Sequence, residues 1–255
     1  METISSSGSV VYSRHTASEI ITREFSAGAK ASNWRRVPVA NYRSGPIAIY
    51  GFARGLYEAL QKCQKGGHDW FFIDHGYLGA GHFDGYYSVT KNAFQYSGMD
   101  HYDSERLDKI RPELKPMRHG EHILLLPPSR AYAKFIDLDV DEWIERYSKL
   151  DTDREIRVRE KYNKKTGLGD REPFEDALKD CHAVVTYNSK GAITAAIEGI
   201  SVFDTQDCCI TGIAGDLSDI DSPDLNIDRE SWLRALCNHQ FTLEEMKKWD
   251  LVTIC

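Results

Sequence analysis

Polar residues follow a predicted buried strand in the second half of the chain. The apolar run 183–185 is followed by the polar segment TYNS and then by the small, apolar segment 191–197, which predicts a helix ended by Gly199 in a left-handed conformation. A helix that begins at the carboxyl end of a parallel strand presents unpaired backbone amides and a partial positive charge. The segment therefore predicts a phosphate site, with an ordinary strand-turn-helix unit as the alternative. The candidate ligands are Thr186, Tyr187, Asn188 and Ser189.

Basic and hydroxyl side chains follow two further predicted strands. Residues 121–126 (EHILLL) form an apolar run that ends in Pro-Pro-Ser, and residues 155–159 (EIRVR) predict the next strand. Arginine and lysine at strand exits can donate charge-assisted hydrogen bonds to a phosphate, although a solvated basic edge strand fits the same pattern. These candidates are Ser129, Arg130, Arg159 and Lys161.

Two groups that can accept a proton stand at the end of an earlier predicted strand, 69–74 (DWFFID). Asp74 and His75 leave this strand at the edge where open α/β sheets hold ligands, and either can take the proton of an acceptor hydroxyl. A structural hydrogen-bonded pair is the alternative. The glycine-rich loop that follows carries rings that can stack on a base or a sugar. These rings are Tyr77, His82, Phe83, Tyr86 and Tyr87. The candidate acceptor ligands are Arg54, Tyr77, Tyr87, Lys91 and Asn92.

Alternating strand and helix patterns predict an α/β fold with two Rossmann-like halves facing a cleft. Residues 1–45 are rich in Ser, Thr and Ala and are expected to form a peripheral arm. A polar, proline-bearing connection over 98–117 predicts a boundary near Met117. We therefore expect an acceptor-side domain over 46–117 and a donor-binding domain with C-terminal helices over 118–255. The last helix is expected over 241–249, with a capping box from Thr242 to Glu245.

The composition favours a soluble protein of the reduced cytoplasm. The 255 residues are 41% hydrophobic and carry a net charge of −7, and no apolar run approaches the roughly 20 residues of a membrane span. An acidic average disfavours non-specific nucleic-acid binding, but a local basic groove can override it. The N-terminal segment lacks the apolar core of a signal peptide. The six cysteines have no zinc-type spacing.

The strand-turn-helix segment resembles the donor-binding segment of GT-B glycosyltransferases, especially the capsule-type ones. The positions that fit are Thr186, Asn188, Ser189, Ala195, Gly199, Ile200 and Val202. Three positions depart from the family pattern: Thr194 stands where many relatives have a ribose-binding Glu, Ala192 where Gly is common, and Ser201 in place of Pro. The resemblance makes Thr194 a donor candidate and leaves the donor nucleotide open.

Over most of residues 46–250 the chain is also similar to short bacteriophage proteins identified as glycosyltransferases. The similarity rests on GFARGLYEAL, WFFIDHGY, VTKNAFQ, VVTYNS and WLRALCNHQFTLEEM.

These resemblances imply an enzyme that transfers a hexosyl or pentosyl group from a nucleotide sugar to a hydroxyl. The donor would be a UDP-sugar, another nucleoside diphosphate sugar or a CMP-sugar, and no cofactor is expected. No catalytic metal is expected. The phage resemblance implies a 5-hydroxymethyl pyrimidine in DNA as the acceptor. A capsular or other glycan is the alternative acceptor, a non-catalytic nucleotide- or sugar-binding module is the alternative function, and no membrane partner is expected.

Overall fold

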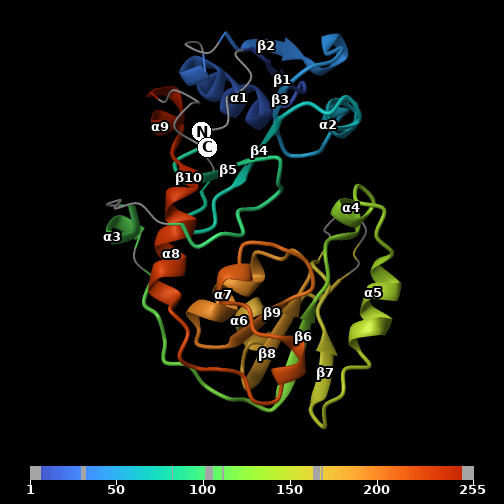
Figure 1. Ribbon diagram of the computed structural model, residues 1–255, viewed down its shortest axis with the longest axis vertical. Coiled ribbons are helices and arrows are strands. Elements are labelled where there is room, and N and C mark those ends of the chain that lie inside the picture. The colour runs from blue at the N-terminus through green and yellow to red at the C-terminus, as the bar shows by residue number, and fades with distance from the viewer. Residues whose placement is uncertain are drawn as a thin grey trace. The chain divides into compact units, whose positions relative to one another are not determined.

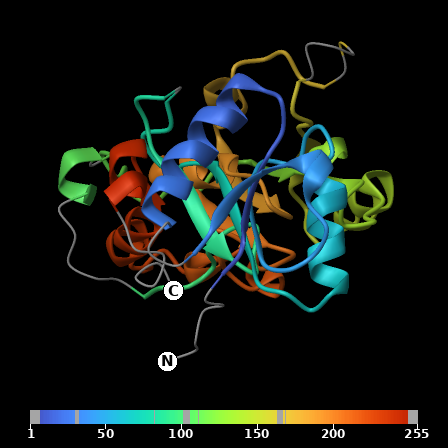
Figure 2. The same ribbon diagram turned by 90° about the horizontal axis from the view of Figure 1, so that it is seen from above.

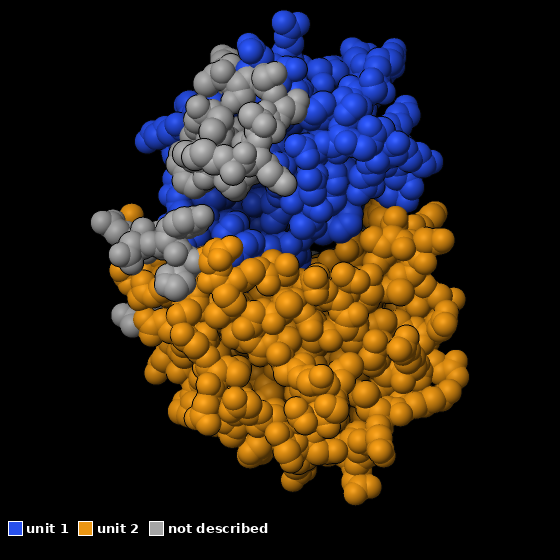
Figure 3. Space-filling view, viewed as in Figure 1, with its two compact units in different colours: residues 1–96, 104–106, 236–255 blue, residues 97–103, 107–235 orange. Residues whose placement is uncertain are grey.

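The computed structural model describes residues 7–29, 33–81, 83–100, 106–110, 112–162, 167 and 169–248 (Figure 1). The chain divides into two compact units, coloured separately in Figure 3. Unit 1 comprises residues 1–96, 104–106 and 236–255, and unit 2 comprises residues 97–103 and 107–235. The C-terminal residues expected in the donor-side domain therefore belong to unit 1.

Unit 1 contains a six-stranded sheet in the order β10-β5-β4-β3-β1-β2. Strands β4, β3, β1 and β2 are parallel to one another, whereas β5 runs antiparallel to both β4 and β10. The strands are β1 (Ser9–Tyr12), β2 (Arg35–Pro38), β3 (Ile47–Tyr50), β4 (Trp70–His75), β5 (Tyr87–Lys91) and β10 (Gln240–Phe241).

The two faces of this sheet are covered by different helices (Figure 2). Helix α1 (Thr16–Gly28) packs on one face, where its buried residues join Val10, Ala48 and Phe71 in one core. Helix α9 (Leu243–Lys248) contributes Met246 to the same core. Helix α2 (Leu56–Lys65) packs on the opposite face, which also carries the short 3₁₀ segment η2 (Val39–Asn41). The capping box is confirmed, because the backbone N–H of Thr242 donates to Glu245 Oε2 at 2.8 Å.

Residues 9–41 differ from the expected peripheral arm, since β1 lies between β3 and β2 inside the sheet. Val10 and Val11 are fully buried on opposite faces, and Ala17, Ile21 and Phe25 give α1 an apolar stripe at four-residue spacing. A four-residue strand is too short to show a convincing period, and the serines and threonines of α1 hide its stripe. The sequence composition therefore understated the structure of this segment.

Unit 2 contains a four-stranded parallel sheet in the order β7-β6-β8-β9. The strands are β6 (His122–Leu126), β7 (Glu155–Val158), β8 (Cys181–Thr186) and β9 (Ser201–Asp204). Every residue of β6 and β8 is buried, as expected for central strands covered on both faces. The helical segments are α4 (Arg130–Ala133), α5 (Val140–Tyr147), α6 (Phe174–Ala177), α7 (Gly191–Ile197), η3 (Thr211–Ile213) and η4 (Leu217–Asp219).

Helices α3 (Arg106–Ile110) and α8 (Arg229–Asn238) each contain one of the four points where the chain changes units. The expected α/β class is confirmed, since both sheets are mostly parallel and carry helices between their strands. No helix in the described part of the chain is long and apolar enough to cross a membrane.

Candidate active site

The carboxyl edge of the unit 1 sheet brings together a histidine and a tyrosine. Tyr50 ends β3 and His75 ends β4, and Tyr50 Oη lies 3.3 Å from His75 Nε2. The imidazole also stacks on the ring of Tyr87, with centroids 6.0 Å apart and an angle of 23° between the planes. His75 is exposed, whereas Tyr87 is fully buried. One side of the imidazole is therefore fixed by tyrosines while the residue stays accessible.

Asp74 and His75, the two candidate bases, project to opposite faces of this sheet. Side chains alternate along a strand. Phe71 and Ile73 belong to the core beneath α1, while Phe72 belongs to the core beneath α2. His75 continues the first set and Asp74 the second, so a ligand on the α1 face meets the imidazole and not the carboxylate.

Burial raises the pKa of Tyr50 to about 12, with smaller contributions from the Asp74 carboxylate and from Tyr87. The Tyr50 phenol is therefore protonated at neutral pH and can donate to or accept from His75. Tyr50 is the residue of this edge that sequence reasoning missed. Its position at the end of the predicted strand 46–50 was the available signal, because parallel strand ends meet at one edge.

The expectation that Tyr77 and Tyr87 stack on the acceptor is wrong, because both rings are buried. Tyr87 is 0% exposed and Tyr77 is 7% exposed, so neither ring offers a free face to a planar ligand. Tyr77 Oη instead accepts a hydrogen bond from the N–H of Tyr96 at 2.7 Å, and Tyr87 Oη accepts one from the N–H of Phe83. These rings pack the edge of the domain, which was the structural alternative. His82 lies outside the described residues.

Lys91 and Asn92 lie at the opposite edge of the sheet from His75, which corrects their grouping with the catalytic candidates. Strand β5 is antiparallel to β4, so Lys91 pairs with Phe71 near the beginning of β4. Lys91 Nζ lies 3.6 Å from an Asp69 carboxylate oxygen, and Asn92 Nδ2 donates to the same carboxylate at 2.9 Å. The direction of β5 depends on its pairing with β4, which local sequence does not indicate.

Arg54 lies at the same carboxyl edge as His75, in the loop after β3. Its Nη1 donates to the backbone carbonyl of Arg14 at 3.0 Å, which links the loops that follow β3 and β1. Arg54 adopts a φ of 60°, a left-handed conformation in a non-glycine residue. The contact with the Arg14 carbonyl therefore holds the Arg54 guanidinium near the carboxyl edge of the sheet.

In unit 2, the polar turn after β8 has the compact geometry expected of it. Thr186 is fully buried, and its Oγ1 donates to the Leu126 carbonyl while accepting from the N–H of Ser189 at 2.9 Å. Ser189 Oγ in turn accepts from the N–H of Gly191, the first residue of α7. Tyr187 is partly buried against the core, and its burial raises the pKa of its phenol. Asn188 is partly buried in the same turn, and Thr194 is exposed on α7.

Arg159 is held at the exit of β7 with part of its hydrogen-bonding capacity unused. Its guanidinium lies over the Phe174 ring at 5.3 Å, and its Nη2 donates to the Glu172 carbonyl at 2.6 Å. The side chain is 15% exposed, and Nη1 is buried with no hydrogen-bond partner among the described residues. The Glu172 carboxylate lies 3.9 Å from that atom. A buried cationic donor of this kind suits an anionic ligand.

The remaining donor candidates are more exposed or already paired. Arg130 forms hydrogen bonds with the carboxylates of both Asp141 and Glu160, and these contacts hold the pKa of the guanidinium above its usual value. Ser129 caps α4 by accepting from the N–H of Tyr132. Lys161 is exposed and forms an isolated bridge with Asp170. The parallel sheet thus collects the candidates at one edge, but Arg130 is neutralised by its partners.

Within the described residues, no group of three or more His, Cys, Asp or Glu side chains is arranged to hold a metal ion. The expectation that no catalytic metal is needed stays a prediction.

No protein-family model and no curated protein matches this chain at the level of sequence. Two transferases are among the solved structures that match it along most of its length. One is the KpsC β-Kdo 2,4 transferase of Thermosulfurimonas dismutans, with 13% identity, a TM-score of 0.51 and coverage of 92% of this chain and 91% of that chain. The other is the KpsC β-Kdo 2,7 transferase of the same organism, with 10% identity, a TM-score of 0.53 and coverage of 89% of each chain.

The fold is GT-B-like. The likeness extends over both units of the chain, and it agrees with the fold implied by the strand-turn-helix segment around Thr186. At this level of identity it shows a shared fold, while the roles of individual residues rest on their geometry.

Proposed function

We propose that the protein is a glycosyltransferase that moves a sugar from a nucleotide-activated donor to a hydroxyl of a saccharide. The observation that carries this proposal is the fold, which is shared across about nine-tenths of the chain with two Kdo transferases. The chemistry at the two sheet edges supports it. One edge presents an imidazole that can accept a proton, and the other presents a buried cationic donor beside a polar turn.

Unit 2 is the donor side in this proposal. Arg159 binds a phosphate of the nucleotide through its unused Nη1. The turn from Thr186 to Ser189 follows β8, which lies on the other side of β6 from β7. It therefore lies at the carboxyl edge of the same sheet, where open α/β sheets hold ligands. The cation stabilises the negative charge that develops on the departing phosphate oxygen. Arg130 contributes less, because Asp141 and Glu160 already satisfy it.

Unit 1 is the acceptor side, and His75 is the proposed general base. The acceptor oxygen attacks the anomeric carbon, the bond from that carbon to the phosphate oxygen breaks, and the nucleotide leaves with the electron pair. The hydroxyl proton passes to the imidazole. Tyr50 orients this ring through the 3.3 Å contact at Nε2.

A saccharide is favoured over DNA as the acceptor. The DNA proposal needs planar side chains that stack on a flipped base. Of the candidate rings, Tyr77 and Tyr87 are buried, while Phe83 and Tyr86 are partly buried. The neighbours that share the fold bear the names of Kdo transferases, so nucleotide-activated Kdo is the first donor to test.

The experiment is a transfer assay with UDP-, GDP- and CMP-sugars against neutral and acidic oligosaccharides and against DNA that contains 5-hydroxymethylcytosine. The expected product is an oligosaccharide heavier by one sugar residue. Transfer to the modified DNA alone would restore the DNA acceptor. Binding of a nucleotide sugar with neither transfer nor hydrolysis would identify a non-catalytic module.

A further inference from the structure

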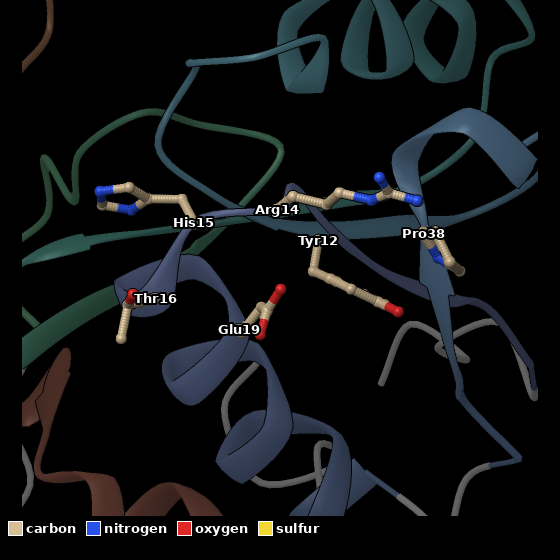
Figure 4. A pocket seen from close by; sticks show the side chains of 6 residues that line it. All are labelled: Tyr12, Arg14, His15, Thr16, Glu19 and Pro38. Carbon is tan, nitrogen blue, oxygen red and sulfur yellow. The ribbon is translucent and has the colours of Figure 1, made fainter.

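A polar cavity of about 350 Å³ opens in unit 1 at the carboxyl end of β1 (Figure 4). It is lined by the last residue of β1, the loop after it, the first turns of α1 and the last residue of β2. These residues are Tyr12, Arg14, His15, Thr16, Glu19 and Pro38. In Figure 4 the Glu19 carboxylate rises from α1 toward the centre of this group, and Arg14 projects above Tyr12 toward Pro38. None of these six residues was a candidate ligand on sequence grounds.

The charged side chains of this cavity do not contribute hydrogen bonds or ion pairs to the described part of the fold. Arg14, His15 and Glu19 make no side-chain hydrogen bond or ion pair with any residue in the described ranges. Their backbone is nevertheless fixed, because Arg54 donates to the Arg14 carbonyl and Arg36 donates to the Glu19 carbonyl at 2.9 Å. The cavity therefore presents exposed donors and acceptors on a backbone that is held in place.

The mixture of groups suits a sugar better than an isolated phosphate. A carboxylate can accept from two neighbouring hydroxyls, while a guanidinium, an imidazole and a threonine hydroxyl can donate to sugar oxygens. Tyr12 and Pro38 add apolar surface. Glu19 would repel a phosphate placed among the same residues, and its negative charge offsets the positive charge of Arg14. The Arg36 guanidinium covers one face of the Tyr12 ring at 3.8 Å from its centroid, which fixes the ring.

The cavity and His75 share one edge and one face of the sheet. Val10, on the same face of β1 as Tyr12, lies in the core beneath α1, as do the partly buried Tyr50 and the residues Phe71 and Ile73 that precede His75. Strands β1, β3 and β4 are consecutive neighbours in the sheet. Two strand spacings amount to about 10 Å, so the cavity lies beside the proposed base without containing it.

We propose that this cavity binds a sugar residue of the acceptor glycan adjacent to the residue whose hydroxyl is glycosylated at His75. The inference rests on the proposed transferase function. Glu19 and Arg14 hold the hydroxyls of the bound residue, and the next residue along the glycan extends over Tyr50 to His75. The acceptor is consequently longer than one sugar.

The test uses the full chain with the substitutions Arg14→Gln and Glu19→Gln. The control is Arg23→Gln, which removes an exposed cation of α1 that pairs with Glu24 outside the cavity. Binding of each protein to an array of neutral and acidic oligosaccharides is measured together with transfer kinetics on a disaccharide and on its terminal monosaccharide. Each cavity variant should bind glycans about tenfold or more weakly than the wild type. Its acceptor KM for the disaccharide should rise by about the same factor, with an unchanged donor KM. Neither should change the KM for the monosaccharide, and the control should match the wild type.

The possible failures are distinguishable. Glycan binding that depends on Arg14 and Glu19 without any transfer would support the cavity and remove the transferase function. Transfer with wild-type acceptor KM in both variants would support the function and overturn the cavity proposal. An array on which the wild type binds no glycan would also overturn it, as would an equal loss of disaccharide and monosaccharide turnover.

Discussion

His75 and Asp74 are adjacent in the sequence, but the structure separates them chemically. The sequence identified the end of a buried strand as the place for a base, and it left both residues as candidates. Alternation along β4 directs His75 to the face beneath α1, where Tyr50 meets its ring. A strand tip can therefore be found from the sequence, whereas the choice between neighbours requires knowledge of which helix covers which face.

We expect His75→Ala to lower turnover by about a hundredfold or more, the scale of a lost general base. Donor affinity should be unchanged, since the residue acts on the acceptor. Asp74→Asn serves as the matched variant on the opposite face and should retain most of the activity. Steady-state kinetics at saturating donor measure both. The reverse order of the two effects would identify Asp74 as the base.

Arg159 allows a sharp test of the donor site, because the same strand carries Arg157 as a control. Arg157 is exposed and pairs with Glu155, whereas Arg159 holds a buried Nη1 without a hydrogen-bond partner in the described part of the chain. Arg159→Ala should weaken nucleotide-sugar binding by about 1.5–3 kcal/mol, the usual contribution of a hydrogen bond to a charged group. Isothermal titration calorimetry with the cognate nucleotide measures the effect. Equal affinities for the Arg159 and Arg157 variants would remove Arg159 from the site.

Among the secondary-structure elements, α7 was predicted most fully. The segment Gly191–Ile197 forms the expected helix, and Gly199 has a φ of +79°. A side chain at Gly199 would meet the carbonyl oxygen of Pro116 at 2.0 Å, so glycine is required for space as well as for conformation. The chain after the C-terminal end of α7 thus depends on a contact that no sequence pattern indicates.

Gly199→Ala should reduce the free energy of unfolding by about 2 kcal/mol or more, through left-handed strain and a backbone clash. Gly167→Ala is the control for strain alone, since Gly167 has a φ of +71° with nothing within 4 Å of an added Cβ. Denaturant unfolding of both variants measures the difference. Equal stabilities would mean that the Pro116 contact relaxes at little cost.

The beginning of β8 makes a pH-dependent contribution to stability. His182 is fully buried, its Nε2 lies 2.9 Å from the Ile220 carbonyl, and burial lowers its pKa from 6.5. Arg154 and His119 nearby act in the same direction, while Asp221 opposes them. The unfolded chain therefore binds more protons below pH 6.5, so stability is complete above that pH and falls as the pH drops further.

We expect the midpoint temperature of unfolding of the wild type to be lower at pH 5.5 than at pH 7.5. The decrease should be smaller in His182→Gln. His122 keeps part of the dependence in the variant, because burial also lowers its pKa. Thermal unfolding followed by circular dichroism at both pH values measures the slopes. Identical slopes would show that His182 does not titrate with unfolding.

The direction and order of strands were the least predictable features of the elements. Strand β5 reads from its sequence as another apolar segment, but it runs antiparallel to β4 and carries Lys91 to the far edge. Strand β1 is short and flanked by polar residues, yet it lies in the sheet interior, and its last residue, Tyr12, lines the cavity. Long-range pairing decides both outcomes, and local periodicity does not report it.

For the whole molecule, the alternation of strands and helices was sufficient to predict the α/β class, and the Thr186 turn was sufficient to indicate a GT-B-like fold. Two transferases with this fold cover about nine-tenths of the chain at 10–13% identity. The return of residues 236–248 to unit 1 could not be predicted from a single composition boundary.

The most direct measurement is mass spectrometry of oligosaccharide acceptors after incubation with the nucleotide-sugar panel, for the wild type and for His75→Ala. The proposed function predicts that an oligosaccharide gains one sugar residue from one of the donors, at a rate at least about a hundredfold lower in the variant. The absence of any added sugar on every glycan, or addition only to DNA that contains 5-hydroxymethylcytosine, would contradict it.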